Sequence, residues 1–71
     1  MSGTTLQIKV GIQIQKLREQ KGMSQQDLAA KCNFEKSNMS RLEAGRVNPT
    51  LSTLEKIANA LDVTFIELFS F

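Results

Sequence analysis

The side chains best suited to chemistry in this sequence gather in one short segment that combines cations with hydroxyls: Lys36, Ser37, Ser40 and Arg41. Met39 and Leu42 lie among them at helical spacing, so a helix here has one apolar edge and leaves the polar groups on its other side. Lysine and arginine donate to O6 and N7 of guanine, the commonest specific base contact. Short hydroxyls allow close approach and bond base or phosphate. The segment therefore favours base reading in a DNA groove, and the alternative is an ordinary solvated helix face.

Catalysis and metal binding are poorly served by the rest of the sequence. It contains 0 His and 1 Cys, whereas a tetrahedral zinc site needs several such ligands. Cys32 lies between Leu28 and Phe34, which is typical of a small buried hydrophobe, with a redox sensor as the alternative. We see no poised carboxylate pair, phosphate-cradling glycine loop or nucleophile with a base beside it. We therefore expect no enzyme, no metal and no cofactor.

A helix is predicted from about Thr5 to Lys21, because apolar residues recur there at helical spacing: Leu6, Val10, Ile14 and Leu17. Gly11 interrupts this pattern and weakens the helix relative to alanine. We expect it to let another helix approach closely. Gly22 is expected to end the helix in the left-handed conformation.

The next two helices flank a tight turn. Ser24 with Asp27 forms a short variant of the capping box, and Asn33 is suited to the left-handed position that closes this helix. The following helix is predicted from Lys36 to about Ala44, with Gly45 as its stop.

Two further helices complete an all-α bundle of five helices with short connections. Thr50 caps a helix whose expected buried stripe consists of Leu51, Leu54, Ile57, Ala58 and Leu61. Thr64 and Glu67 form a capping box for a last short helix that ends near Phe69.

The whole chain, residues 1–71, is expected to form one small domain with residues 1–4 frayed. No apolar run approaches a membrane span, and Met1–Val10 lacks the features of a secretory signal. We therefore predict no membrane association and a cytoplasmic location. Residues 51–71 carry one lysine against three acidic side chains, so the basic excess lies earlier, where a polyanion would bind.

The order and spacing of these residues resemble the Cro and phage-repressor type of helix-turn-helix domain, the XRE family. The residues that carry the resemblance are Leu17-Arg18, Lys21-Gly22-Met23-Ser24-Gln25, Leu28-Ala29, Met39-Ser40-Arg41-Leu42-Glu43-Ala44-Gly45, Asn48-Pro49-Thr50-Leu51, Leu54, Ile57-Ala58 and Ala60-Leu61. Phe65–Leu68 stands where the family has its last helix. Each piece is weak alone, but their joint order covers nearly the whole chain. One departure is Glu35, where the family often has Ser or Thr.

The resemblance implies a lambda-repressor-like fold whose second and third helices bind double-stranded DNA, the third in the major groove. Base contacts are then expected from Lys36, Ser37, Ser40 and Arg41. Contacts to the DNA backbone are expected from Gln25, Asn38, Arg46, Asn48 and Thr50. The resemblance also implies that Arg18 pairs with Glu43 and ties the first helix to the end of the third.

The C-terminal segment, residues 64–71, holds more large apolar groups than a five-residue helix can turn inward: Phe65, Ile66, Phe69 and Phe71. An exposed apolar cluster usually marks an interface. We therefore predict a homodimer through this segment. The alternative is that some of these residues only cover the core.

Two functions compete at this point. The first is a dimeric transcriptional regulator that reads a palindromic operator and acts as a repressor or an activator. The second is a protein-interaction module on the same fold, such as an antitoxin or adaptor, with a toxin or polymerase as partner. A phage, restriction–modification or toxin–antitoxin context remains open.

Overall fold

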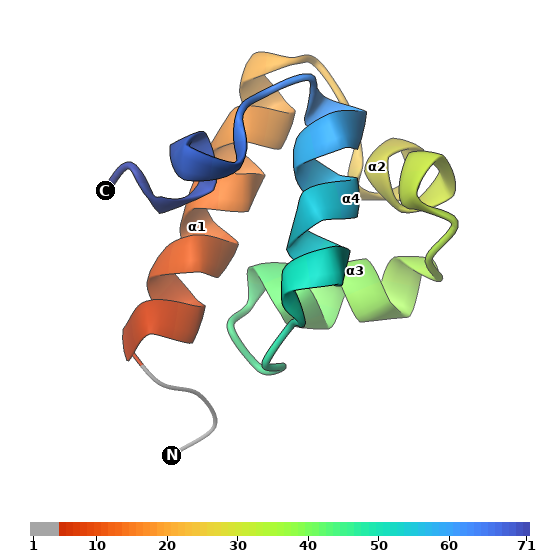
Figure 1. Ribbon diagram of the computed structural model, residues 1–71. Coiled ribbons are helices and arrows are strands. Elements are labelled where there is room, and N and C mark those ends of the chain that lie inside the picture. Colours follow the sequence, from red (N-terminus) through yellow and green to blue (C-terminus); the bar gives the residue numbers. More distant parts are fainter. Residues whose placement is uncertain (1–4) are drawn as a thin grey trace.

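The computed structural model describes residues 5–71, so the expected fraying of residues 1–4 lies outside the described part. Four α-helices follow one another, α1 (Thr5–Gln20), α2 (Gln25–Cys32), α3 (Lys36–Glu43) and α4 (Leu51–Leu61), and a 3-10 turn, η1 (Phe65–Phe69), ends the chain (Figure 1). α3 packs against α1 and α2, while α4 packs against α2 and η1. The α2–α3 pair is the helix-turn-helix unit, and the other elements support it. No helix within residues 5–71 is long and apolar enough to cross a membrane.

The predicted caps form. The Ser24 hydroxyl accepts from the Asp27 backbone N–H at 3.0 Å, and the Asp27 carboxylate accepts from the Ser24 N–H at 3.0 Å. Thr50 caps α4 in the same way, accepting from the Thr53 N–H at 3.1 Å. Gly22 and Asn33 both adopt the left-handed conformation, with φ of 70° and 59°. These bonds join groups a few residues apart, which explains why sequence signals located them.

The last element is the point at which the five-helix prediction is wrong. Thr64 and Glu67 do form the capping box, but the segment that follows is a 3-10 turn and not an α-helix. A segment of 5 residues closes few backbone bonds, and the tighter i→i+3 pattern suits such short pieces. The fold is therefore four α-helices and one 3-10 turn.

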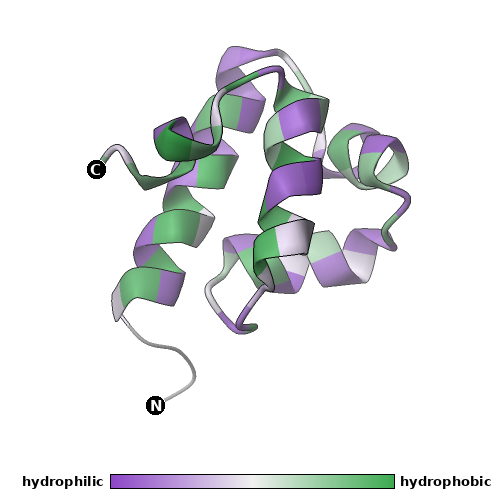
Figure 2. Cartoon of the chain, viewed as in Figure 1, coloured by the Kyte–Doolittle hydropathy of each residue, from purple (hydrophilic) through white to green (hydrophobic). Residues whose placement is uncertain are grey.

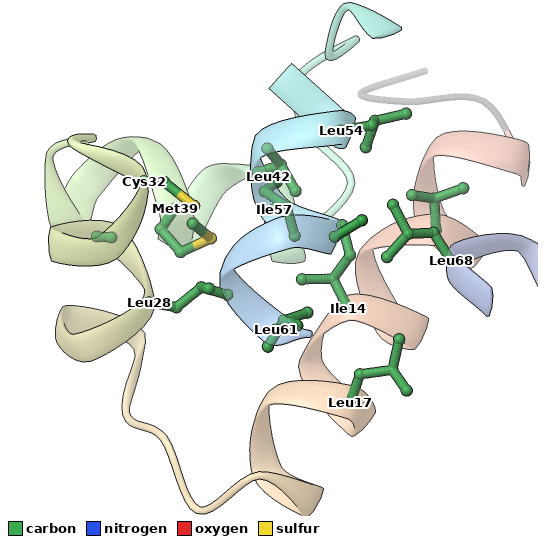
Figure 3. Close-up of a cluster of buried hydrophobic side chains, with 13 residues drawn as sticks. Ile14, Leu17, Leu28, Cys32, Met39, Leu42, Leu54, Ile57, Leu61 and Leu68 are labelled. Atoms are coloured by element: carbon green, nitrogen blue, oxygen red, sulfur yellow. The ribbon is translucent and has the colours of Figure 1, made fainter. Parts of the chain in front are cut away.

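The core lies between the helices and joins side chains from all five elements (Figure 3). Apolar and polar residues alternate along α1 and α4, as Figure 2 shows. The apolar residues of one side of each helix are buried, among them Ile14 of α1 and Ile57 of α4. The fully buried side chains of largest volume are Ile14, Leu28, Met39, Ile57, Leu61 and Leu68. Each helix thus contributes an apolar stripe to one shared core.

Leu51, predicted for the buried stripe of its helix, lies at the surface, and so does Leu6, the first residue of the apolar pattern of α1. Leu6 is 56% exposed and Leu51 is 71% exposed. Both belong to the first turn of a helix and line an open groove of about 200 Å³, together with Pro49 and Phe69. The helical spacing is correct at both positions, but no element of the described chain covers these first turns.

Gly11 allows the close approach that its position predicted. A Cβ atom at this residue would lie 2.5 Å from the carbonyl oxygen of Glu43 and 2.7 Å from that of Leu42. Real Cβ atoms do not come so near to a backbone oxygen, so α1 and α3 meet here without a side chain between them. The contact sets the position of the C-terminal end of α3 against α1.

Candidate nucleic-acid interface

The helix α3 is oriented by its two apolar side chains. Met39 is fully buried and Leu42 is 5% exposed, and both belong to the core. The side chains predicted to read bases all lie on the exposed side of the same helix: Lys36, Ser37, Ser40 and Arg41. A helix that is buried along its apolar edge leaves cationic donors and short hydroxyls exposed, and such groups can form hydrogen bonds with the bases and phosphates of DNA.

Two polar side chains on this exposed side contact each other. Arg41 donates from Nη2 to the Oδ1 atom of Asn38 at 2.6 Å. The two residues are three positions apart, a spacing that brings side chains together on one helix face. Asn38, expected to contact the DNA backbone, thus has its amide oxygen occupied by Arg41.

The residue before α3, Glu35, caps the helix without a side-chain hydrogen bond. Its backbone is extended, with φ of −75° and ψ of 147°, so the chain still enters the helix cleanly. A carboxylate near a helix N-terminus is favoured by the helix dipole. It also places a negative charge near Lys36, at the end of α3 that would approach DNA.

A buried ion pair fixes the other end of α3. Arg18 donates from Nε to Glu43 at 2.7 Å and from Nη2 to the second carboxylate oxygen at 3.1 Å. A third donor of Arg18 reaches the Met23 carbonyl at 2.8 Å. The hydrogen bond to Glu43 raises the pKa of Arg18, so the guanidinium stays charged. The structure thus places the two residues of the expected pair in direct contact and connects α1, α3 and the turn before α2.

Gln25, at the start of α2, joins this ion pair. Its side-chain amide donates from Nε2 to Glu43 Oε1 at 2.9 Å. The residue is half-buried, so its side chain is held in place while part of it still faces solvent. A phosphate contact from Gln25 stays a prediction, but the structure shows what would orient the amide for it.

The other expected backbone contacts lie in or beside the connection between α3 and α4. Arg46, Asn48 and Thr50 are all exposed. The Thr50 hydroxyl accepts from the backbone N–H of Thr53 at 3.1 Å and donates to the side-chain hydroxyl of Thr53 at 3.0 Å. Thr50 therefore serves the N-terminus of α4, and any DNA contact would use what this cap leaves free.

Cys32 is a buried side chain with no features of a reactive thiol. It is 4% exposed, and its sulfur lies 3.8 Å from the carbonyl oxygen of Lys56. Burial raises the pKa of the Cys32 thiol, which disfavours the reactive thiolate. Among the described residues, no group of three or more His, Cys, Asp or Glu side chains could hold a metal ion. The interpretation of Cys32 as a small core hydrophobe is therefore confirmed.

The C-terminal residues predicted for a dimer interface divide into two groups. Phe65, Ile66 and Phe71 are exposed, Ile66 by 76%. Phe69 is half-buried, packs against the core and lies 5.5 Å from Phe65 between ring centroids. Leu68 is the residue of this segment that is fully buried. We refer to Phe65, Ile66 and Phe71 as the tail cluster.

Comparison with known proteins shows which family this chain belongs to. The helix-turn-helix family model matches residues 14–68, and the chain belongs to this XRE-type family of DNA-binding transcriptional regulators. The family is not one of enzymes, which agrees with the sequence prediction.

Two relatives are of similar size to this chain. An HTH-type transcriptional regulator, y4dJ, of Sinorhizobium fredii is 42% identical over 59 residues, which cover 83% of this chain and 77% of the relative. The control protein C.MunI of a Mycoplasma species is 38% identical over 66 residues, which cover 92% of this chain and 89% of that protein.

Among solved structures, the restriction-modification controller protein C.AhdI of Aeromonas hydrophila superposes with a TM-score of 0.85 at 37% identity. The superposition covers 87% of this chain and 94% of that one. The lambda-repressor-like arrangement of the helices is therefore shared with experimentally solved regulators.

Two contacts in this interface escaped sequence reasoning. The i, i+3 spacing of Asn38 and Arg41 was visible, and side chains at that spacing are neighbours on a helix. The bond between Gln25 and Glu43 joins residues 18 positions apart, and no local signal announces it. The first could have been found from the sequence, whereas the second needed the packed fold.

Proposed function

We propose that this chain is a sequence-specific transcriptional regulator that binds a palindromic operator as a homodimer, with α3 in the major groove. The single observation that carries the proposal is the exposed polar side of α3, held outward by the buried Met39 and Leu42. A helix that reads bases in the major groove needs outward side chains that can form hydrogen bonds with base edges. On the exposed face of α3 these are the cations Lys36 and Arg41 and the short hydroxyls of Ser37 and Ser40.

The context we propose is that of a restriction–modification controller or phage-type repressor. The control protein C.MunI and the controller C.AhdI are similar to this chain over most of its length. A shorter match, 41% identical over 54 residues, is to the immunity repressor of Bacillus phage phi105. Such a regulator would act by excluding or recruiting polymerase at the operator.

The dimer in this proposal forms through the tail cluster. Phe65, Ile66 and Phe71 present apolar surface that water disfavours. Two copies related by a two-fold axis would place their α3 helices on half-sites one DNA turn apart, about 34–36 Å. The palindrome of the operator would mirror the symmetry of the protein.

The test begins with selection of bound sequences from a random duplex pool, followed by titration of the selected operator and of random DNA. Arg41→Ala should weaken operator binding by about 1–3 kcal/mol, or roughly 5- to 150-fold, since a bidentate contact to guanine is lost. Binding to random DNA should weaken less. Fluorescence anisotropy on both duplexes at one stated salt concentration measures the difference.

Arg41→Lys is the matched control, because it keeps the charge and removes the two-pronged donor edge. It should retain affinity for random DNA and lose preference for the operator. Equal losses on both duplexes in Arg41→Ala would place Arg41 on phosphate. Failure of the native chain to select any sequence from the pool would overturn the proposal.

The second candidate is a protein-interaction module, favoured by the open apolar groove beside Leu6 and Leu51 and by the tail cluster. An adaptor would be expected to carry apolar residues on the exposed face of α3 as well. That face carries Lys36, Ser37 and Arg41. A pull-down from lysate run beside the operator titration separates the two. A tight protein partner together with no duplex binding would favour the module.

A further inference from the structure

Asn38 and Arg41 form a hydrogen-bonded pair on the outward face of α3. The distance from Arg41 Nη2 to Asn38 Oδ1 is 2.6 Å, short even for a bond from a charged donor. Arginine carries donors and no acceptor, so the amide of Asn38 must turn its oxygen toward Arg41. Both residues are exposed, so the pair contributes to what a ligand of α3 meets and not to the core.

The pair leaves the reading capacity of Arg41 intact. A guanidinium has five N–H donors in a fixed plane, and Asn38 accepts one of the two on Nη2. The other N–H of Nη2 still lies parallel to a donor on either Nη1 or Nε. Arg41 therefore keeps one two-donor edge that matches O6 and N7 of guanine.

The bond also restricts where that edge points. Arginine has a long side chain that loses much rotamer freedom when it is fixed at an interface. Asn38 has a short side chain on the same helix turn, so a bond to it anchors the far end of Arg41 to the helix backbone. The guanidinium is then held in one orientation before DNA arrives, and less freedom is lost on binding.

We propose that Asn38 is a positioning residue that holds Arg41 for one base pair and so helps to set the specificity of the operator. The inference rests on the proposed function of α3 and deepens it. It gives Asn38 a different role from the backbone contact that the family resemblance implied. The amide nitrogen of Asn38 remains available to donate to a neighbouring acceptor on the DNA.

A double-mutant cycle on DNA binding tests the proposal. Asn38→Ala, Arg41→Ala and the double variant are titrated against the selected operator and against operators with each base pair changed in turn. Asn38→Ala should weaken operator binding roughly three- to tenfold and should lose discrimination at the same base pair as Arg41→Ala. In the Arg41→Ala background, removal of Asn38 should change discrimination at that base pair no further. Independent losses that multiply would overturn the proposal.

A second measurement needs no DNA. The Nε–H signal of Arg41 in ¹⁵N NMR relaxation should report an ordered guanidinium in the native chain and a more mobile one in Asn38→Ala. Asn38→Asp keeps an acceptor at the same reach and should keep the order, while the signal of Arg46 serves as an internal control. Melting should be little changed in Asn38→Ala, since the residue is exposed and alanine is the better helix former.

The two measurements separate the possible failures. Specific DNA binding with an Arg41 guanidinium whose order does not depend on Asn38 would overturn this inference and leave the proposed function standing. An ordered guanidinium that depends on Asn38, in a chain that selects no duplex, would overturn the proposed function and with it the role in base reading.

Discussion

At the scale of single residues, Glu43 is a buried carboxylate that depends on its hydrogen-bond partners. Its carboxylate is buried and accepts from Arg18 twice and from Gln25 once. No buried side-chain nitrogen or oxygen within the described residues lacks a partner. A satisfied buried pair adds specific geometry more reliably than net stability, but loss of one member strands the other charge.

Glu43→Gln should therefore destabilise the fold by about 3–5 kcal/mol, because the guanidinium of Arg18 would remain buried without its counter-charge. For a chain of 71 residues the total stability is about 4–10 kcal/mol, so this is a large share. Urea unfolding followed by circular dichroism measures it. The double variant Arg18→Met with Glu43→Leu should lose much less, and equal losses in the single and double variants would contradict the argument.

Asp27 is a second residue with a testable electrostatic role. The backbone N–H of Ser24 lowers the pKa of Asp27 below its ordinary value of 3.8. A lowered pKa in the folded state means that the charged form stabilises the fold above the ordinary value, and that this contribution is lost as pH falls through the folded value. The free energy of unfolding of the native chain should thus fall as pH is lowered from about 6 to about 3.

Asp27→Asn removes the titrating group and keeps an oxygen that can accept from Ser24. Its free energy of unfolding should fall less over the same pH range, as measured by urea titrations at each pH. Similar melting of the two proteins at pH 6 would show that the cap is intact. Identical pH profiles would mean that the bond to Ser24 does not distinguish the two protonation states.

At the scale of elements, the contact between α1 and α3 decides how α3 is placed on the bundle. Gly11 allows this contact, and the obstacle to a larger residue is the backbone of Glu43, which lies only 2.5 Å from the position of a Cβ. A flexible side chain could move aside, but a helix carbonyl cannot without displacing α3. The position of α3 thus depends on one missing methyl group in α1.

Gly11→Ala should destabilise the fold by about 1–3 kcal/mol through this overpacking. Helix propensity alone predicts the opposite sign, a gain of about 1 kcal/mol. Thermal and urea unfolding measure which effect wins. Gly22→Ala is the matched control, because nothing lies within 4 Å of its Cβ and only the φ of +70° opposes it. A stabilised Gly11→Ala variant would show that α1 and α3 separate easily.

At the scale of the whole molecule, the tail cluster stands apart from the core. Leu68 and Phe69 anchor the C-terminal segment, and Gln13 of α1 donates to the Glu67 carbonyl at 2.9 Å. Phe65, Ile66 and Phe71 therefore lie on a segment that is fixed to the bundle and still exposed. A fixed apolar surface is what a symmetric dimer would use.

If the proposed dimer forms, Ile66→Asp should convert it to a monomer, because the most exposed member of the tail cluster would bring two charges together at the two-fold interface. Sedimentation at high micromolar concentration measures the change, and operator binding should weaken with it. Ile66→Leu is the matched control and should remain a dimer. A native chain that sediments as a monomer at that concentration would refute the dimer.

Most of the fold followed from signals within a few residues of each other. Each of these signals depends on groups that are close in the sequence. They are the caps at Ser24, Thr50 and Thr64, the left-handed positions at Gly22 and Asn33, and the helical spacing of apolar residues. The left-handed Asp62 after α4 was not anticipated, although aspartate tolerates that conformation. The sequence also predicted which side of α3 is exposed, because burial of Met39 and Leu42 leaves the polar side of this helix facing outward.

Packing decided the remainder, because burial and pairing depend on which elements meet. Leu6 and Leu51 satisfy the helical pattern and remain exposed, since nothing in the described chain covers their first turns. Gln25 meets Glu43 only when α2 docks beside α3. Local chemistry specified where each helix begins and ends, while the contacts between helices set which side chains face outward and what holds them there.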